Sequence, residues 1–290
     1  MTRPKIALVL GGGGSRGIAH IGVLQVLARE HIPIDIIVGT SMGAIVGALY
    51  AAGNPPEDLA ERLSEFQGTR IFSNPFSARS RQNRIADVLR HQLGSIKFSQ
   101  LKVRMAVTAV DLISGREVVI ESGEVVPALV ASAAVPGAFP PVSRDGMQLA
   151  DGGVIDSVAT GVAYERGFSA KDGGRIIAVD VYPPLNHDHS WGDPLSQIMG
   201  IGLPFHLPTL RSGKDMEPGV GASLWRSFRV LVWYTHETRL AKFPPDVLIR
   251  PELKGAASLN FRDLELPLKA GCEAAEAALP AIKRLLDATG

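Results

Sequence analysis

Residues 34–50 constrain the fold more than any other stretch of this chain, because they place Ser41 between two elements of different type. The β-branched residues before Ser41 predict a buried strand, and the small residues after it predict a helix. In Gly39-Thr-Ser-Met-Gly43, the two glycines allow neighbouring elements to approach a sharp turn closely. The start of the helix offers unpaired N–H groups and a positive dipole end, which favour negative charge beside Ser41. This spacing fits a nucleophilic serine and also a purely structural turn.

A glycine-rich loop near the amino terminus is the second strong feature. Residues 5–10 form a continuous apolar run, typical of a strand buried on both faces, and lead into Gly11-Gly-Gly-Gly-Ser-Arg-Gly17. A helix that is apolar nearly all round is predicted from about residue 15 to 29. Glycines between a strand and a helix can turn several N–H groups toward one point, where an oxyanion would form beside a nucleophilic serine. Arg16 could fix this loop by hydrogen bonds, favour an anionic substrate group or form a structural salt bridge.

A nucleotide site is an alternative interpretation of the same loop, since Gly12, Gly14 and Gly17 satisfy G-x-G-x-x-G. In a nucleotide-binding fold the second strand ends in an acidic residue for the ribose. Here that strand ends in Gly39-Thr-Ser41, and Asp35 lies at its opposite end. No Lys-Ser or Lys-Thr follows the loop either, which disfavours a P-loop. The residues therefore favour an oxyanion site.

Composition limits the class of protein. The chain has 290 residues, of which 46% are hydrophobic, and a net charge of +1. These values predict one domain over residues 1–290 and give no argument for nucleic acid binding. Cys272 is the single cysteine, which fits a reducing compartment, and neither a signal sequence nor a membrane span is predicted. We expect a cytoplasmic protein with a core at about 5–182, an irregular lid-like segment at about 183–221 and a helix-strand-helix unit at 222–290.

Two further regions contribute predicted elements. Amphipathic helices are expected after residue 54, ending at Gly68, and before Gly94. Strands at 103–110 and 117–120 are expected to form a hairpin at a sheet edge. In the rest of the chain we expect strands at 175–181 and 246–249 and helices at 222–240 and 268–286. In the first of these helices, Trp225, Arg229 and Trp233 form a stripe that could meet a lipid surface, the core or another subunit.

Four motifs together resemble the patatin-like phospholipases, including small bacterial members and the esterase domain of neuropathy target esterase. These are residues 11–24, the Ser41 turn, the Ala-Ala-Val-Pro-Gly-Ala-Phe-Pro-Pro-Val run at 133–142, and Asp151-Gly-Gly153. The resemblance covers residues 5 to about 160 well. It implies an α/β fold with a mainly parallel central sheet between helices, and a serine lipid acyl hydrolase that needs no cofactor.

The resemblance also implies roles for individual residues. Ser41 becomes the nucleophile and Asp151 the general base of a Ser–Asp dyad that forms an acyl-enzyme. The expected substrate is a lipid ester, with peripheral contact to a membrane surface, and no metal is expected. Asp156 and Ser157 stand where the family often has Asn and Pro, so Asp156 adds a charge near the site. The remaining assignments are the oxyanion residues Gly12, Gly13, Gly14 and Met42, and the motif-supporting residues Arg16, Gly17, Gly39, Gly43, Gly152 and Gly153.

Several alternatives stay open at this stage. Asp111, at the end of a predicted strand, is a second candidate acid for Ser41, although carboxylates at strand ends often cap turns. Asp180 has the same turn interpretation. His187 and His189 flank Asp188 in a pattern that a metal could use, but a solvated loop explains it as well. An α/β-hydrolase with a Ser-Asp-His triad and a non-catalytic regulator on the same fold are the alternative functions.

Overall fold

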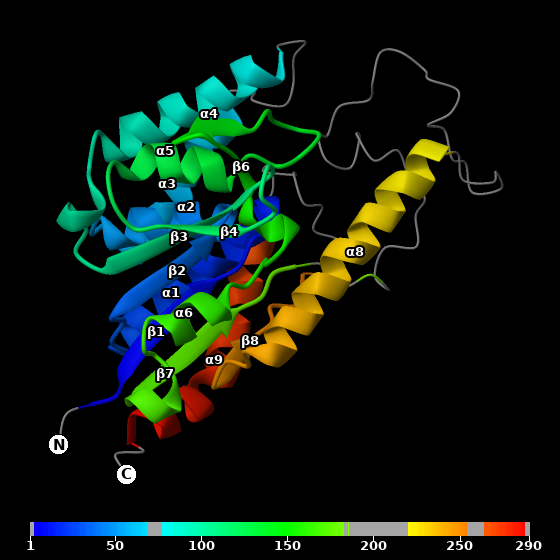
Figure 1. Ribbon diagram of the computed structural model, residues 1–290. Coiled ribbons are helices and arrows are strands. Elements are labelled where there is room, and N and C mark those ends of the chain that lie inside the picture. Colours follow the sequence, from blue (N-terminus) through cyan, green and yellow to red (C-terminus); the bar gives the residue numbers. More distant parts are fainter. Residues whose placement is uncertain (1–2, 69–76, 183–184, 186–219, 254–263, 288–290) are drawn as a thin grey trace.

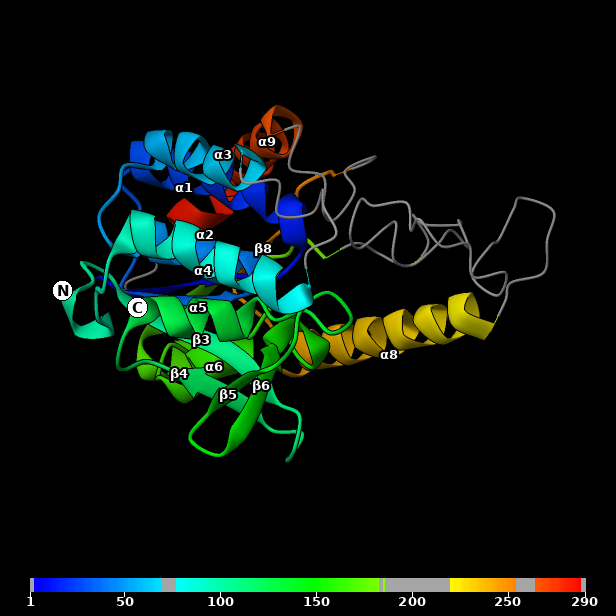
Figure 2. The ribbon, with the colours of Figure 1, turned by 90° about the horizontal axis from the view of Figure 1, so that it is seen from above.

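The computed structural model describes residues 3–68, 77–182, 185, 220–253 and 264–287. Within these ranges a central sheet lies between two layers of helices (Figures 1 and 2). The lid-like segment expected at about 183–221 lies almost wholly outside the described residues. Among the described residues, no helix combines the length and apolarity needed to cross a bilayer.

The sheet is mixed and mainly parallel (Figure 1). Its order is β5-β6-β3-β2-β1-β7-β8, with β4 paired to β3 off this path. The pairs β1–β2, β1–β7, β2–β3 and β7–β8 are parallel, whereas β3–β4, β3–β6 and β5–β6 are antiparallel. The strands are β1 (Lys5–Leu10), β2 (Ile36–Thr40), β3 (Arg104–Asp111), β4 (Glu117–Ile120), β5 (Val142–Arg144), β6 (Met147–Asp151), β7 (Gly174–Val179) and β8 (Val247–Ile249).

Helices cover both faces of the sheet (Figure 2), which confirms the predicted α/β architecture. Alternate side chains of β1 enter the two apolar layers: Leu8 belongs to the layer that includes residues of α1–α5 and α9, and Val9 belongs to the layer that includes residues of α6 and the carboxyl end of α8. The α-helices are α1 (Ala19–Arg29), α2 (Met42–Ala51), α3 (Leu59–Gly68), α4 (Ala78–Leu93), α5 (Val125–Ser132), α6 (Thr160–Glu165), α8 (Val220–Lys242) and α9 (Glu265–Asp287). The 3-10 helices are η1 (Gly14–Ile18), η2 (Pro56–Asp58), η3 (Phe98–Gln100), η4 (Gly152–Val154) and η5 (Ala170–Asp172).

The pairing of β3 determines which strand ends meet. Val107 and Thr108 pair with β2 on one edge and with β4 on the other. Ala109 and Val110 pair with β4 and with β6. Because a strand has only two edges, β2 and β6 must share the edge opposite β4 and lie end to end. Thr40 pairs with Thr108 and Asp151 pairs with Ala109, so the residues that close these two strands face successive positions of β3.

Helices α5 and α6 and the β5–β6 hairpin were not expected from the sequence. Helix α5 contains Pro127 in its first turn, where a missing N–H costs no helical hydrogen bond. The hairpin β5–β6 turns at Asp145 and Gly146, both with positive φ. This hairpin supplies the strand that carries Asp151. The predicted hairpin of 103–110 and 117–120 is confirmed as β3–β4.

Helices α1 and α9 pack unusually closely, through a glycine on each. A Cβ at Gly22 would overlap the carbonyl oxygen of Leu268, and a Cβ at Gly271 would overlap the carbonyl oxygen of Ala19. Both contacts are with backbone, which cannot rotate away. This contact joins the last helix to the helix that follows the glycine loop (Figure 2).

We expect Gly271→Ala to lower the free energy of unfolding by ~1–3 kcal/mol, because an added methyl group overpacks this contact. Urea denaturation followed by circular dichroism measures the change. The control is Glu273→Ala on the exposed side of α9, which should change stability by less than about 0.5 kcal/mol. A Gly271→Ala protein as stable as the control would show that the helices can separate without cost.

Candidate active site

Ser41 lies at a strained turn between β2 and α2. It is the N-cap of α2 and has φ 52° and ψ −120°, a conformation that is rare for a residue with a side chain. Its backbone N–H donates to Ser132 Oγ at 2.8 Å. A Cβ at Gly39 would lie 2.5 Å from Ala44 Cα, and one at Gly43 would overlap Leu10 O. The two glycines therefore allow the close approach that the sequence motif predicts.

Asp151 closes β6 beside this turn. Its carboxylate accepts a hydrogen bond from the Gly153 N–H at 2.8 Å, and the Ser41 side chain is close enough to lower the pKa of this carboxyl. Both Ser41 and Asp151 are only 6% exposed. Burial raises the pKa of Asp151 to about 6, although Ser41 and the hydrogen bond from Gly153 act in the opposite direction. A Cβ at Gly152 would lie 2.7 Å from Thr108 Oγ1, so a side chain here would push the acid away from β3.

Asp111, the other candidate acid, caps a turn. Its carboxylate accepts hydrogen bonds from the Ser114 hydroxyl at 2.7 Å and from the N–H groups of Ile113, Ser114 and Gln148. These bonds, led by the one from Ser114, lower the pKa of Asp111 to about 2. A carboxylate held this way is a weak base. The turn interpretation of Asp111 is therefore confirmed.

Gly12 fixes the glycine loop and does not offer a free donor. Its N–H donates to Ser157 O at 2.9 Å, and its carbonyl accepts from Ser157 Oγ at 3.1 Å. The assignment of Gly12 as an oxyanion donor is therefore wrong for this conformation, because its N–H is already used. Gly12 still lies against the serine, since a Cβ there would be 3.3 Å from Ser41 Cβ.

The next donors in the loop are oriented by the same contacts. In a planar trans peptide the C=O and the following N–H point in opposite directions, so the Gly13 N–H points away from Ser157. Gly14 begins η1 and Met42 begins α2, positions whose N–H groups have no partner inside their helices. Within the described part of the chain, no protein acceptor is found for the N–H of these three residues.

His20 and Arg16 also hold the loop. His20 is fully buried, and its Nε2 lies 2.8 Å from Gly11 O. Burial lowers the pKa of His20 to about 4, so the ring is neutral at pH 7 and Nε2 donates to the carbonyl. Arg16 donates from Nε to Val181 O at 2.9 Å and from a terminal nitrogen to Leu253 O. Arg16 therefore fixes the loop by hydrogen bonds, which is one of the roles predicted for it from the sequence.

Asp156 is an ion-pair partner of α8. Arg239 donates to Asp156 Oδ2 and, at 2.6 Å, to Glu117 Oε2. Burial and, to a lesser extent, the neighbouring Asp156 raise the pKa of Glu117 to about 7, although Arg239 lowers it. The extra charge that Asp156 brings near the site is thus compensated by Arg239. This pair ties α8 to the segment that follows Asp151.

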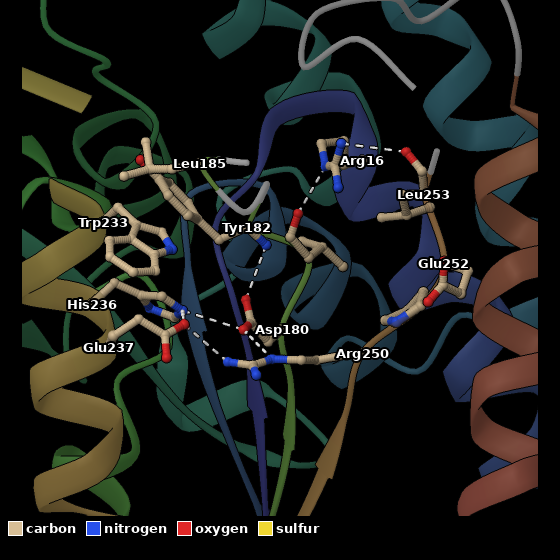
Figure 3. Close-up of a pocket in the computed structure, with 12 residues that line it drawn as sticks. Arg16, Asp180, Tyr182, Leu185, Trp233, His236, Glu237, Arg250, Glu252 and Leu253 are labelled. Carbon is tan, nitrogen blue, oxygen red and sulfur yellow. Dashed lines mark hydrogen bonds and ion pairs between the residues drawn. The ribbon is translucent and has the colours of Figure 1, made fainter. Parts of the chain in front are cut away.

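A second polar cluster lies at the end of β7 (Figure 3). Asp180 accepts from the Tyr182 N–H, as a turn-capping residue does, but also interacts with His236 and Arg250. Donor atoms of Asp180, His236 and Glu237 lie within 4.8 Å of one another, close enough to hold a metal ion. The Arg250 guanidinium already contacts both carboxylates, at 2.9 and 3.1 Å, and supplies the positive charge that a metal would.

None of the histidines in the described ranges contacts Ser41 or Asp151 by a hydrogen bond. His20 binds Gly11, His91 binds Glu65 and His236 binds Asp180. His187 and His189, considered above for a metal, lie outside the described residues, as does His206.

Sequence patterns gave no signal for three supporting residues. Ser132 and Ser157 bind the backbone at Ser41 and Gly12, and Thr40 Oγ1 lies 2.7 Å from Thr108 Oγ1 beneath the turn. Their partners are 68 to 145 positions away, so only the fold brings them together. His20 occurs in the quoted amino-terminal motif, but its spacing alone indicates no partner.

Comparisons with known proteins agree with this fold. The crystal structure of VipD from Legionella pneumophila superposes with a TM-score of 0.56 at 12% sequence identity, covering 98% of this chain and 67% of VipD. An uncharacterized NTE family protein of Mycobacterium tuberculosis is 30% identical over 282 residues, which is 96% of this chain and 47% of the relative. Lysophospholipase NTE1 of Candida glabrata is 27% identical over 295 residues, covering 97% of this chain and 16% of that protein.

The chain spans less than half the length of these curated relatives. The model of the patatin-like phospholipase family matches residues 8–164, a range that includes the glycine loop, the Ser41 turn and Asp151. Because this match covers more than half of the 290 residues, the chain belongs to the patatin-like phospholipase family.

Proposed function

We propose that this chain is a serine lipid acyl hydrolase, in which Ser41 is the nucleophile and Asp151 is the general base. The observation that carries the proposal is the position of the Ser41 side chain beside the buried carboxyl of Asp151, whose pKa burial raises to about 6 although Ser41 lowers it. A general base works best when its pKa is near the working pH, and Asp151 is closer to that condition than Asp111. The lysophospholipase name of a distant relative supports a lipid ester as the substrate.

The proposed reaction has two halves. Asp151 takes the Ser41 proton as Oγ attacks the ester carbonyl carbon, and the carbonyl oxygen becomes an oxyanion. The C–O bond to the alcohol then breaks, and the alcohol leaves with the proton from Asp151. Water, deprotonated by the same carboxylate, hydrolyses the acyl-Ser41 ester and releases the fatty acid. This route needs no metal or organic cofactor.

We assign the oxyanion contacts to the N–H groups of Gly13, Gly14 and Met42. Their support is that these groups have no acceptor in the described part of the chain and that the loop lies against Ser41. The start of α2 adds its positive dipole end at Met42. Backbone donors of this kind are already oriented before the substrate binds, so they need no reorganisation when charge develops.

We also propose a peripheral contact with lipid through α8. The stripe of Trp225 and Trp233 is half-buried, and Trp225 packs against the core, so this stripe is not the exposed one. The side chains of Leu224, Leu231 and Tyr234 are instead 67%, 66% and 67% exposed. Their spacing places them on one side of the helix, and this is the side that we propose contacts the lipid.

Ser41→Ala tests the central assignment. The wild type is expected to hydrolyse both a lysophospholipid and the short ester p-nitrophenyl butyrate, and the variant should lose at least ~10² in rate, because the covalent route is removed. Released fatty acid and p-nitrophenol are measured, with a thermal melt as the folding control. A folded wild type that hydrolyses neither ester would favour the non-catalytic regulator.

Asp151→Asn should lower kcat/KM at least ~10²-fold, since the amide keeps the shape and removes the base. Asp111→Asn is the matched control: it removes a carboxylate near the same edge of the sheet and should retain activity within about tenfold. The pH profile of the wild type gives a second readout. Because only ionised Asp151 can accept the proton, kcat/KM should fall as the pH drops below about 6. If kcat/KM falls only near pH 4, or if Asp111→Asn loses activity, a group other than Asp151 is the base.

Gly13→Ala should cost ~10²–10³ in kcat, the usual effect of displacing one oxyanion donor. The physical reason is steric, because the new Cβ would lie 2.8 Å from Val181 Cγ2. The double variant Gly13→Ala/Val181→Ala removes that methyl group and should recover part of the lost rate. Full activity of a folded Gly13→Ala protein would move the oxyanion site elsewhere.

A further inference from the structure

The carboxyl end of α5 contacts both members of the proposed dyad through their backbone N–H groups. Ser132, the last residue of α5, accepts a hydrogen bond from the Ser41 N–H on its Oγ at 2.8 Å. Two positions later, the carbonyl oxygen of Ala134 accepts the Asp151 N–H at 3.1 Å. Ser132 and Ala134 are 0% and 1% exposed, so both contacts are shielded from solvent. One short segment therefore fixes an N–H group of each residue.

The fold holds this segment firmly. Helix α5 lies between α4 and β3 and also contacts β6 (Figures 1 and 2). Strand β5 pairs with β6 only as far as Leu149, and Ala134 takes the next position along that edge, at Asp151. Farther along the chain, the carbonyl oxygen of Pro140 accepts a hydrogen bond from Gln82 of α4 at 2.8 Å. The residues that follow α5 are thus fixed to the sheet and to a neighbouring helix.

Ser132 controls one of the two peptide planes that define the conformation of Ser41. The plane after Ser41 is fixed by α2, because the Ser41 carbonyl oxygen accepts the N–H groups of Ala44 and Ile45 at 3.0 and 3.1 Å. The plane before Ser41 carries the N–H that donates to Ser132. With both planes held, Ser41 keeps its φ of 52°, which is unfavourable for a residue with a side chain. A relaxed φ would turn the Cβ, and with it Oγ, relative to Asp151.

The contact also defines what Ser132 does not do. Its Oγ binds a backbone N–H and none of the reacting atoms, so any effect on the chemistry must act through the position of Ser41. Because the Ser41 N–H already donates to Ser132, it is not one of the donors assigned to the oxyanion.

We propose that Ser132 is a positioning residue, whose hydroxyl holds the strained backbone of Ser41 so that Oγ lies beside Asp151. The inference rests on the proposed function, because it concerns the same nucleophile. It adds a requirement for a hydroxyl group at the end of α5. The rate of attack by Ser41 depends on this hydroxyl, whereas binding of the ester does not.

Ser132→Ala removes the acceptor of the Ser41 N–H. With p-nitrophenyl butyrate, kcat should fall about 10- to 100-fold with little change in KM, because a misplacement of about 1 Å can cost that much in rate. Labelling of Ser41 by a fluorophosphonate should slow in parallel. Since the Ser41 side chain lowers the pKa of Asp151, its displacement should also move the acid limb of kcat/KM to higher pH.

A matched pair of variants separates the hydroxyl from packing and decides the question if Ser132→Ala does not fold. The side chains in Ser132→Thr and Ser132→Val have the same shape, but only Thr can accept the Ser41 N–H. Ser132→Thr should therefore have a kcat several-fold above that of Ser132→Val. Thr160→Val is the control for loss of a buried hydroxyl elsewhere, since Thr160 Oγ1 donates to Phe243 O at 2.6 Å. It should lower the melting temperature and leave kcat unchanged.

The outcomes distinguish this inference from the proposed function. A folded Ser132→Ala protein with the kcat and pH profile of the wild type overturns the positioning role, as does an equal kcat in Ser132→Thr and Ser132→Val. Both results leave the proposed function intact, because the wild type still hydrolyses the ester. A wild type that neither hydrolyses p-nitrophenyl butyrate nor reacts with the fluorophosphonate overturns the proposed function and the inference with it.

Discussion

The arrangement of the site depends on the hydrogen-bond register of β3. Strands β2 and β6 pair with the same edge of β3 and run in opposite directions, so their last residues lie next to each other. This pairing places Ser41, which follows β2, beside Asp151, which ends β6. The contact with β3 requires Gly152, and the turn itself requires Gly39 and Gly43. The same geometry buries the carboxylate, and burial is what raises its pKa. A strand pairing thus sets both the position and the basicity of the proposed base.

The glycine loop depends on a second set of contacts that come from elsewhere in the fold. His20 binds one loop carbonyl and Ser157 binds the next, so the peptide planes have fixed orientations. Ser157 belongs to the segment that begins at Asp151, and α8 holds that segment through the Arg239–Asp156 pair. The proposed base and the glycine loop are therefore parts of one connected structure. Loss of the Arg239–Asp156 ion pair would therefore disturb both the segment after Asp151 and the glycine loop.

Much of this could be predicted from the sequence, because the relevant signals are local. The strand-turn-helix units at the glycine loop and at Ser41 follow from apolar runs and glycine spacing, and both occur as expected. The use of the Gly12 N–H and the role of Ser132 could not be predicted, because their partners are distant in sequence. The β5–β6 hairpin is local, but its first strand has only three residues, which is too short to show a periodic pattern. The sequence already favoured Asp151 over Asp111 as the acid, and the structure adds that Asp111 caps a turn through Ser114, whereas Asp151 is buried beside Ser41. On α8, periodicity identified an aromatic stripe but not which side faces the protein.

Reaction with a fluorophosphonate measures the nucleophilicity of Ser41 most directly, because it requires the activated serine but no lipid recognition. We expect stoichiometric modification of Ser41 in the wild type, detected by intact mass and peptide mapping, and a rate reduced at least ~10²-fold in Asp151→Asn. Each variant lacking one of the seven histidines should react at a rate within about tenfold of the wild type. Equal labelling rates in the wild type and Asp151→Asn, or loss of labelling on removal of one histidine, would contradict the Ser–Asp dyad.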